Sequence, residues 1–509
     1  MATRPSKEKD TSRKSETKTL DLLELDDLLL SKDGEPKHDL KLEDPRRRLV
    51  HQGSLQCSSK RKEYRVFLLD HALIVTKPKV VDGRERLRMI DHPIPVQLLQ
   101  VSSEQTRKTV FGCIPLGETC YQLRFSSLGK RFNKGKALTM LCLTAEAANT
   151  WTEAVNAQRD ANRQSTESNV LKLGQDMLEG NGEIRVNCAA LYDNDQIIAY
   201  GTDDGVYFQP QSGRPRKAID LTGVRHIEVL EDLSLLVVLA ERSAFTFPLD
   251  ALDQFDRMNR MSRISRGLVS FLRAGRCLGR TMVCTAKTSR YSSTVKALEQ
   301  REPEPESTLL VNRKLKTSLL DSGNKLKVFK EFYLGMELYS IHFLKTKLCA
   351  AGATGFEVID LETLETQVLL DPADNALSFV RQYKYPRPLC VYRIKNEFLV
   401  CYREFAFFVN KSGWKSEKDV VIHWEGTPTS CALHYPYIAA FSPNFVEIRH
   451  VDDGSLVQLI HESNVQCLYT ESSPLRTSIG NTTSQVASKT NSTLVSSAGK
   501  VMFLTPSPS

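Results

Sequence analysis

The sequence lacks the features that would place the chain across a membrane or outside the cell. No apolar run approaches the roughly 20 residues that a membrane-spanning helix needs. Residues 1–18, MATRPSKEKDTSRKSETK, are polar and charged and contain no hydrophobic core, so they do not form a secretory signal. We therefore expect a cytoplasmic protein.

Signatures of catalysis and of metal binding are missing too. The sequence contains no H-E-x-x-H, no G-x-S-x-G and no His and Cys residues at metal-ligand spacing. Residues 129–137, GKRFNKGKA, approach a phosphate-binding loop, but the spacing is one residue too long and Ala137 replaces the Ser or Thr that would bind Mg²⁺. We interpret this segment as a loop between strands, and we expect no enzyme activity, cofactor or metal.

The 12 cysteines form no C-x-x-C pair. Several lie singly inside apolar runs, as Cys188, Cys284, Cys349, Cys401 and Cys431 do. This distribution is typical of buried free thiols, because a disulfide framework or a zinc site would need regular spacings.

A strong excess of charge is absent as well. Lys plus Arg number 69 against 61 Asp plus Glu, which gives a net charge of +8. Over this length the excess is mild, so only local clusters are informative, and we expect no nucleic-acid partner. The 41% hydrophobic and 26% charged residues are ordinary for a globular protein, and 509 residues suggest about three domains.

A repeated unit dominates the downstream two thirds of the chain. Residues 183–208, EIRVNCAALYDNDQIIAYGTDDGVYF, alternate short apolar runs with clusters of turn residues, which predicts strand, turn, strand, turn, strand. Similar units recur, so we predict a mainly β fold with a β-propeller of roughly seven blades, to within about one blade. The further units cover 226–249, 267–298, 325–370, 376–410, 420–460, and 464–469 together with 501–504.

The preceding stretch has a different pattern. Seven strand-like runs end in a helical segment at 144–160, in which Ala148, Trp151 and Val155 share one face and Thr144 is the expected N-cap. The turn at Asp70 joins two of the runs into a hairpin. The runs cover 48–57, 63–69, 72–77, 87–99, 109–114, 121–125 and 137–143.

Residues 45–163 resemble a pleckstrin-homology domain, in which seven strands form a β-sandwich and a C-terminal helix packs its tryptophan into it. Residues 183–505 resemble a citron-homology (CNH) domain, most closely at 188–190, 199–207, 237–239 and 268–299. Residues 1–44 are expected to be a disordered linker, apart from a short acidic, leucine-rich helix at 20–30 that docks on the next domain. Residues 164–182 are expected to be a second linker.

The order of these two domains is that of the C-terminal half of fungal Rho-type guanine nucleotide exchange factors. In that family a helical Dbl-homology domain precedes them and performs exchange, and the 45 residues before Arg46 are too few to contain one. The resemblance implies a non-catalytic regulator or adaptor that binds a Rho-family small GTPase or its regulators at the inner face of the plasma membrane. The alternatives are a truncated copy of a complete exchange factor and, on fold alone, a vesicle-tethering scaffold.

One cluster of basic residues suggests where such a protein would meet lipid. In pleckstrin-homology domains the corresponding loop holds an inositol phosphate head group, and several converging cations suit a polyanion. The family's phosphoinositide pattern, however, has a basic residue at the position that Glu63 occupies here, so a solvated basic turn is the alternative. The candidate lipid-binding residues are Lys60, Arg61, Lys62, Arg65, Lys77 and Lys79.

A second basic run has an arginine at every third position: Arg257, Arg260, Arg263 and Arg266. On a helix these would form one stripe, which favours either an acidic partner or a solvated helix between blades. Four aromatic residues, Trp414, Trp424, Tyr435 and Tyr437, could likewise contribute to a binding surface or to packing between blades.

Overall fold

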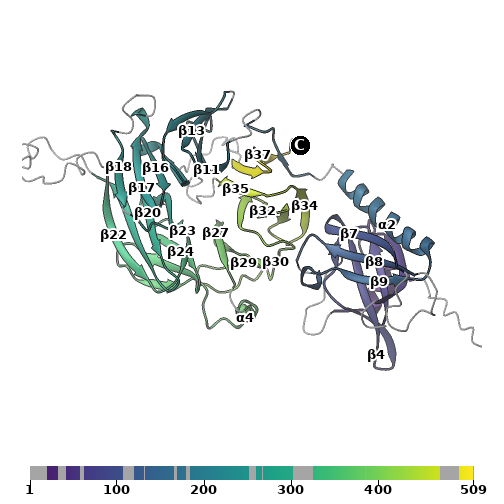
Figure 1. Ribbon diagram of the computed structural model, residues 1–509. Helices are drawn as coiled ribbons and strands as arrows, with labels where there is room; N and C mark the ends of the chain where they lie inside the picture. Colours follow the sequence, from purple (N-terminus) through teal and green to yellow (C-terminus); the bar gives the residue numbers. More distant parts are fainter. Residues whose placement is uncertain are drawn as a thin grey trace, which may run out of the picture. The chain divides into compact units, whose positions relative to one another are not determined.

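The computed structural model describes residues 20–31, 40, 42–57, 62–106, 120–130, 132–164, 169–178, 184–211, 213–251, 259–265, 267–301, 325–383, 386–470 and 492–507. The chain divides into two compact units, Met1–Glu167 and Ser168–Ser509, and each is treated by itself (Figure 1). In the described ranges no helix combines the length and the apolar character needed to cross a membrane.

The first unit is built on one nine-stranded sheet in the order β1-β5-β4-β3-β2-β9-β8-β7, with β6 paired to β4. Side chains from both halves of this order, such as Val66 of β3 and Phe125 of β8, share one core, so the sheet folds over on itself as a sandwich. The strands are β1 (Leu29–Leu30), β2 (Leu49–Cys57), β3 (Glu63–Leu69), β4 (Ala72–Val81), β5 (Arg84–Met89), β6 (Ile94–Pro95), β7 (Leu99–Thr106), β8 (Cys120–Ser127) and β9 (Leu138–Cys142). Two short 3-10 helices, η1 (Val96–Leu98) and η2 (Phe132–Gly135), connect them.

Helix α2 (Ala145–Gln164) closes the sandwich beside β7 (Figure 1). The Oγ1 of Thr144 accepts the backbone N–H of Ala147 at 3.1 Å, as expected of an N-cap. Trp151 is buried, and its ring makes edge contacts with His51 at a centroid distance of 4.3 Å and with Phe125 at 5.9 Å. The predicted helix and its tryptophan contact are therefore confirmed.

The acidic, leucine-rich segment forms helix α1 (Leu22–Leu28), which begins with a capping box between Asp21 and Glu24. Leu25 is fully buried in a cluster with Phe67 and Ile74 on the face of the sheet opposite the sandwich core. After the helix, β1 pairs in parallel with β5. The segment thus docks on the domain that follows it in sequence, as predicted.

The second unit is a propeller of seven four-stranded sheets, so the predicted architecture is confirmed (Figure 1). Blade 1 contains β11 (Val186–Tyr192), β12 (Ile197–Thr202), β13 (Val206–Pro210) and β14 (Arg216–Ile219), and blade 2 contains β15 (Val224–Leu230), β16 (Leu235–Ala240), β17 (Ser243–Pro248) and β18 (Ser262–Ser265). Blade 3 contains β19 (Phe271–Cys277), β20 (Arg280–Thr288), β21 (Ser293–Gln300) and β22 (Leu326–Leu334), and blade 4 contains β23 (Leu338–Phe343), β24 (Lys347–Gly352), β25 (Gly355–Asp360) and β26 (Thr366–Val368).

Blade 5 contains β27 (Pro388–Ile394), β28 (Glu397–Tyr402), β29 (Phe405–Val409) and β30 (Val421–His423), and blade 6 contains β31 (Ser430–His434), β32 (Tyr437–Ser442), β33 (Phe445–His450) and β34 (Leu456–His461). Blade 7 contains β35 (Gln466–Thr470), β36 (Thr493–Ser497), β37 (Lys500–Pro506) and β10 (Leu171–Leu173). Short helices η4 (Glu231–Leu233), η5 (Leu249–Ala251), η6 (Asn375–Leu377) and α4 (Ser378–Gln382) lie in the connections.

The blade sequences explain this stacking. The second strands are apolar on both faces because each face packs against a neighbouring blade, and all six residues of β16 are buried. Where backbones approach most closely a side chain has no room: a Cβ added to Gly201 would lie 2.5 Å from the Cys188 sulfur.

Ring closure corrects one boundary of the sequence analysis. Leu171–Leu173, inside the stretch interpreted as a linker, forms β10 and pairs antiparallel with β37 at the other end of the unit. The Gln458 side chain of blade 6 bonds both the N–H and the carbonyl of Leu171, at 3.1 and 2.7 Å. A three-residue strand carries too little periodicity to be recognised without its distant partner.

Blade assignment differs from the prediction in one further place. The strand at 326–334, which we grouped with the fourth unit, is the outermost strand of blade 3 and pairs with β21. Strands β21 and β22 are hydrogen-bonded to each other although residues 302–324 separate them in the sequence, and such pairing cannot be read from spacing. The predicted strand at 109–114 lies outside the described residues.

The closing strand yields a stability prediction. Leu171→Ala should lower the free energy of unfolding of the propeller by about 2–5 kcal/mol, because Leu171 is 1% exposed and packs between blades 6 and 7. Denaturant titration followed by circular dichroism measures the change. Lys172→Ala is the matched control on the exposed side of β10 and should change stability little. Equal effects of the two substitutions would contradict the role assigned to Leu171.

A buried histidine yields a pH prediction. His434 in β31 contacts the hydroxyl of Thr493 in β36 at 3.1 Å, and burial lowers its pKa from 6.5 to about 4. As the pH falls, the unfolded chain therefore protonates this histidine at a higher pH than the folded chain does. The contribution of neutral His434 to the free energy of unfolding is fully present above pH 6.5 and is lost as the pH falls toward 4. Between pH 7 and pH 5 this histidine should account for about 2 kcal/mol of lost stability.

We expect the difference in unfolding free energy between pH 7 and pH 5 to be smaller by that amount in His434→Gln than in the natural chain. Glutamine retains a polar group near Thr493 but does not titrate. An unchanged difference would show that His434 is not a source of the acid sensitivity.

Candidate functional site

A ladder of basic residues runs along one face of the β4–β5 hairpin in the first unit. Lys77 and Lys79 of β4 lie directly opposite Arg88 and Arg86 of β5. Successive residues of a strand point to alternate faces, so these four side chains share one face. We call Lys77, Lys79, Arg86 and Arg88 the basic ladder.

The structure places the candidate lipid-binding residues of the sequence analysis on different faces of the sheet. Arg65 lies opposite Thr76 on the other face, where its guanidinium stands 5.4 Å from the centroid of the Phe67 ring. Because Thr76 and the two lysines Lys77 and Lys79 point to opposite faces of the sheet, Arg65 does not converge with Lys77 and Lys79 on one pocket. Lys62 is exposed beside the start of β3, and Lys60 and Arg61 lie outside the described residues.

Sequence reasoning missed the two arginines of the ladder. The signal was present as the alternation Arg84, Arg86, Arg88, which has the period of a strand. Arg86 also donates to the backbone carbonyl of Asp27 at the end of α1, which fixes its guanidinium at the edge of the sheet. Like charges placed directly opposite one another on neighbouring strands destabilise a sheet.

The arginine run of the second unit does not form the expected helix where the structure describes it. Ser262–Ser265 is strand β18, and Arg263 stacks on the Phe245 ring of the adjacent strand at 5.1 Å. Arg260 precedes the strand and pairs with Asp250 at 3.2 Å. Pairing of this segment with β17 as the fourth strand of blade 2 outweighs the helical preference suggested by an arginine at every third position. Arg257 and Arg266 lie outside the described residues.

The aromatic residues considered for a binding surface separate into two groups. Trp424 is buried and its indole N–H donates to the carbonyl of Tyr402 at 2.9 Å, so it packs in the core. Trp414 is 45% exposed and donates to Asp371, and Tyr435 is 50% exposed.

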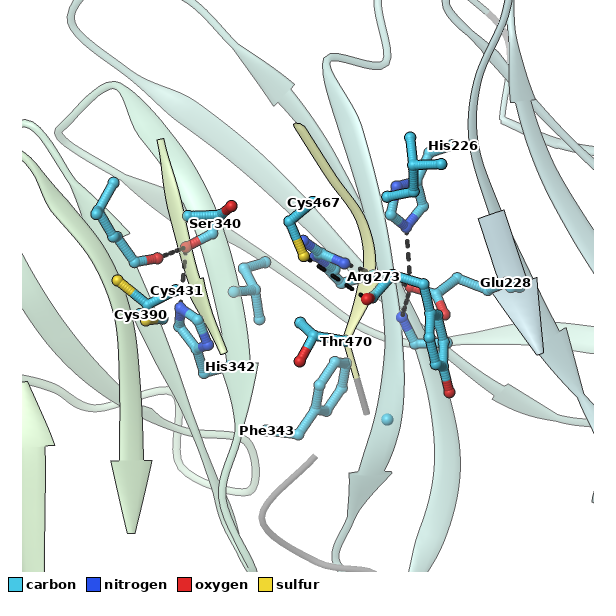
Figure 2. A pocket seen from close by; sticks show the side chains of 18 of the residues that line it. His226, Glu228, Arg273, Ser340, His342, Phe343, Cys390, Cys431, Cys467 and Thr470 are labelled. Carbon is cyan, nitrogen blue, oxygen red and sulfur yellow. Dashed lines mark hydrogen bonds and ion pairs between the residues drawn. The ribbon is translucent and has the colours of Figure 1, made fainter. Parts of the chain in front are cut away.

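The second unit has a cavity at the centre of the propeller. It has a volume of about 760 Å³, and residues of the innermost strand of every blade line it (Figure 2). Several of these strands, β11, β15, β23, β27 and β35, carry a register shift against the next strand. Such bulges redirect side chains at the rims of barrels and rings.

Charged groups meet on one side of the cavity. The Glu228 carboxylate contacts His226 Nε2 at 2.9 Å and the Arg273 guanidinium at 3.9 Å, as Figure 2 shows. Burial alone would raise the pKa of Glu228, but the hydrogen bond from His226 and the nearby Arg273 outweigh it and hold the pKa below its ordinary value. The carboxylate therefore remains charged at neutral pH.

The opposite side is less polar. His342 Nε2 and the Ser340 hydroxyl are 2.9 Å apart, and Ser340 donates to the carbonyl of Leu389 at 3.2 Å (Figure 2). Burial lowers the pKa of His342 to about 4, so its imidazole is neutral under physiological conditions.

Comparison with known proteins supports both units. Residues 194–471, more than half of the chain, match the CNH domain family. The chain belongs to the CNH domain family. Residues 49–113 match the pleckstrin homology domain, so both families expected from the sequence are confirmed.

Relatives that carry both parts are fungal Rho1 exchange factors. Over 490 residues the chain is 34% identical to "Rho1 guanine nucleotide exchange factor 1" of Schizosaccharomyces pombe, which covers 90% of this chain and 36% of that protein. It is 33% identical to "Rho1 guanine nucleotide exchange factor 2" of the same organism and 27% identical to "RHO1 GDP-GTP exchange protein 2" of Saccharomyces cerevisiae, with 84% and 85% of this chain covered. The chain spans little more than a third of the length of these relatives.

A solved structure agrees with the assignment of the second unit. The "AfRom2 CNH domain" is 33% identical to this chain and superposes with a TM-score of 0.53. The match covers 67% of this chain and 99% of that structure. The propeller described above is thus the fold of a CNH domain.

Proposed function

We propose that this chain is a regulatory and adaptor component of Rho-family small GTPase signalling. The observation that carries the proposal is the similarity to Rho1 exchange factors across both units, which extends over 84–90% of the chain. In this proposal the pleckstrin homology unit brings the chain to an anionic membrane and the CNH propeller binds a protein partner, either the GTPase or one of its regulators.

The membrane role rests on the basic ladder. Four cations on one face of a hairpin form a surface that acidic lipid head groups can neutralise, and each basic residue near such a surface contributes about 1 kcal/mol. Phosphoinositides fit this chemistry because arginine binds phosphate with two parallel hydrogen bonds. We accordingly propose a cytoplasmic protein that associates peripherally with the inner face of the plasma membrane.

The partner-binding role rests on the propeller. Its central cavity presents Arg273 and His226 beside a charged carboxylate, and the exposed Trp414 and Tyr435 provide aromatic contact area. Arg260 and Arg263 already contact groups within their own blade, so they are not part of the proposed partner surface.

We further propose that the 509-residue chain does not catalyse nucleotide exchange. The two matched families occupy 49–113 and 194–471, and the described parts of both units are mainly β, whereas exchange in this family is the work of a helical domain. The alternative, a piece of a longer exchange factor, assigns the activity to sequence outside these residues.

A lipid-binding experiment tests the ladder. Lys77→Gln/Lys79→Gln should lower binding of the full chain to vesicles that contain phosphatidylserine and phosphatidylinositol phosphate by roughly 30-fold, because two contributions of about 1 kcal/mol are lost. Vesicle co-sedimentation at fixed ionic strength measures the partition coefficient.

Arg65→Gln is the matched control, since it removes a cation from the opposite face of the same sheet. It should leave vesicle binding within about 5-fold of the natural chain, as expected for a single charge distant from the lipid. If Arg65→Gln weakened binding as much as the double variant, the ladder would not be the lipid surface.

An exchange and capture experiment tests the signalling role. The purified chain should leave the rate of GDP release from a Rho1-type GTPase unchanged, measured with a fluorescent nucleotide. Immobilised chain should retain that GTPase, or a regulator supplied with it, in a manner that depends on the bound nucleotide. Acceleration of GDP release would refute the non-catalytic proposal, whereas failure to retain either partner would refute the adaptor role.

A further inference from the structure

Three cysteines that are distant in the sequence meet at the wall of the central cavity. Cys390 of β27 and Cys401 of β28 are directly opposite each other in blade 5, and Cys431 comes from β31 in blade 6. Their sulfur atoms all lie within 4.8 Å of one another. Sequence spacing gave no sign of this group, because its members are joined by strand pairing and blade packing.

The positions of the three sulfurs are fixed by the fold. The strand register holds Cys390 and Cys401 side by side, and the hydroxyl of Tyr392 donates to the carbonyl of Cys431 at 2.7 Å. This buried hydrogen bond joins blade 5 to blade 6 two residues from Cys390. A ligand set held on rigid strands needs little rearrangement to bind an ion.

The group is buried but has access to the cavity. Cys401 and Cys431 are 0% and 3% exposed, and Cys390 is 9% exposed. Cys390 and Cys431 line the cavity (Figure 2), and Cys401 is not among the lining residues. An ion could therefore enter from the cavity and retain one coordination position directed toward it.

The geometry suits a thiophilic metal ion. Metal–sulfur bonds of about 2.3 Å place the sulfurs of a thiolate set roughly 4 Å apart, which three sulfurs within 4.8 Å reach by small side-chain rotations. Soft thiolate ligands select zinc(II) and copper(I) over magnesium, calcium or manganese. A single disulfide would leave the third cysteine unused.

We propose that Cys390, Cys401 and Cys431 bind one thiophilic metal ion, zinc(II) or copper(I), at the junction of blades 5 and 6. Each thiol releases its proton to solvent as its sulfur coordinates the ion. Copper(I) is satisfied by three sulfurs, whereas zinc(II) needs a fourth ligand. Water from the cavity can supply it, or the imidazole of His342, which Figure 2 shows beside Cys390, can do so by giving up its contact with Ser340.

The experiment uses the full chain purified under anaerobic, reducing conditions and supplied with zinc(II) or copper(I) in separate arms. Native mass spectrometry and metal analysis should find about one ion per chain in one arm or both, and X-ray absorption should show three sulfur neighbours at about 2.3 Å. Retention of the ion in the presence of a competing chelator distinguishes the metal that the site prefers.

Cys401→Ala and Cys431→Ala should each lose the ion. Cys349→Ala is the matched control, because Cys349 is equally buried in blade 4 but lies outside the group, and it should retain the ion. Because the absorption measurement is made on the natural chain, a variant that fails to fold does not remove the test. The proposal is refuted by absence of a bound ion in both arms, by a coordination shell without sulfur, or by a Cys390–Cys401 disulfide in the reduced preparation.

Discussion

The pairing of β10 with β37 is the constraint on which the propeller depends. Six blades are formed from consecutive strands, but the seventh takes its outermost strand from the other end of the unit. The pairing ties the start of the unit to its last strand, and Gln458 of blade 6 adds to it by bonding both backbone groups of Leu171. The cavity, with its lining drawn from every blade, exists only because this ring is closed.

Much of the fold could be predicted from the local periodicity of apolar residues in the sequence. The alternation of apolar runs and turn clusters predicted seven blades, and the helical spacing of Ala148, Trp151 and Val155 predicted helix α2 with its buried indole. These signals work because the side chains of one strand or helix report which of its faces is buried. The sequence pattern does not predict pairing between strands that are distant in the sequence, such as β10 with β37 or β22 with β21.

The same distinction explains the sites. The sequence pattern grouped Arg65 with Lys77 and Lys79 as candidate lipid-binding residues, but only the register shows that Arg65 lies on one face and Lys77 on the other, opposite Arg88. The three cysteines are a stronger example of a group that the sequence pattern does not reveal, because Cys431 lies beside Cys390 only through the packing of one blade on the next. Charge clusters can thus be located from composition, whereas convergence of side chains depends on tertiary contacts.

The short connection between the two units has a mechanical consequence. Helix α2 ends at Gln164 and β10 begins at Leu171, so the strand that closes the ring is also the one to which the first unit is covalently attached. If the first unit is held at a membrane and the propeller by a partner, as proposed, tension between them would load the β10–β37 hydrogen bonds before those of any other blade. The same three-residue strand that completes the ring is therefore where pulling would begin to open it.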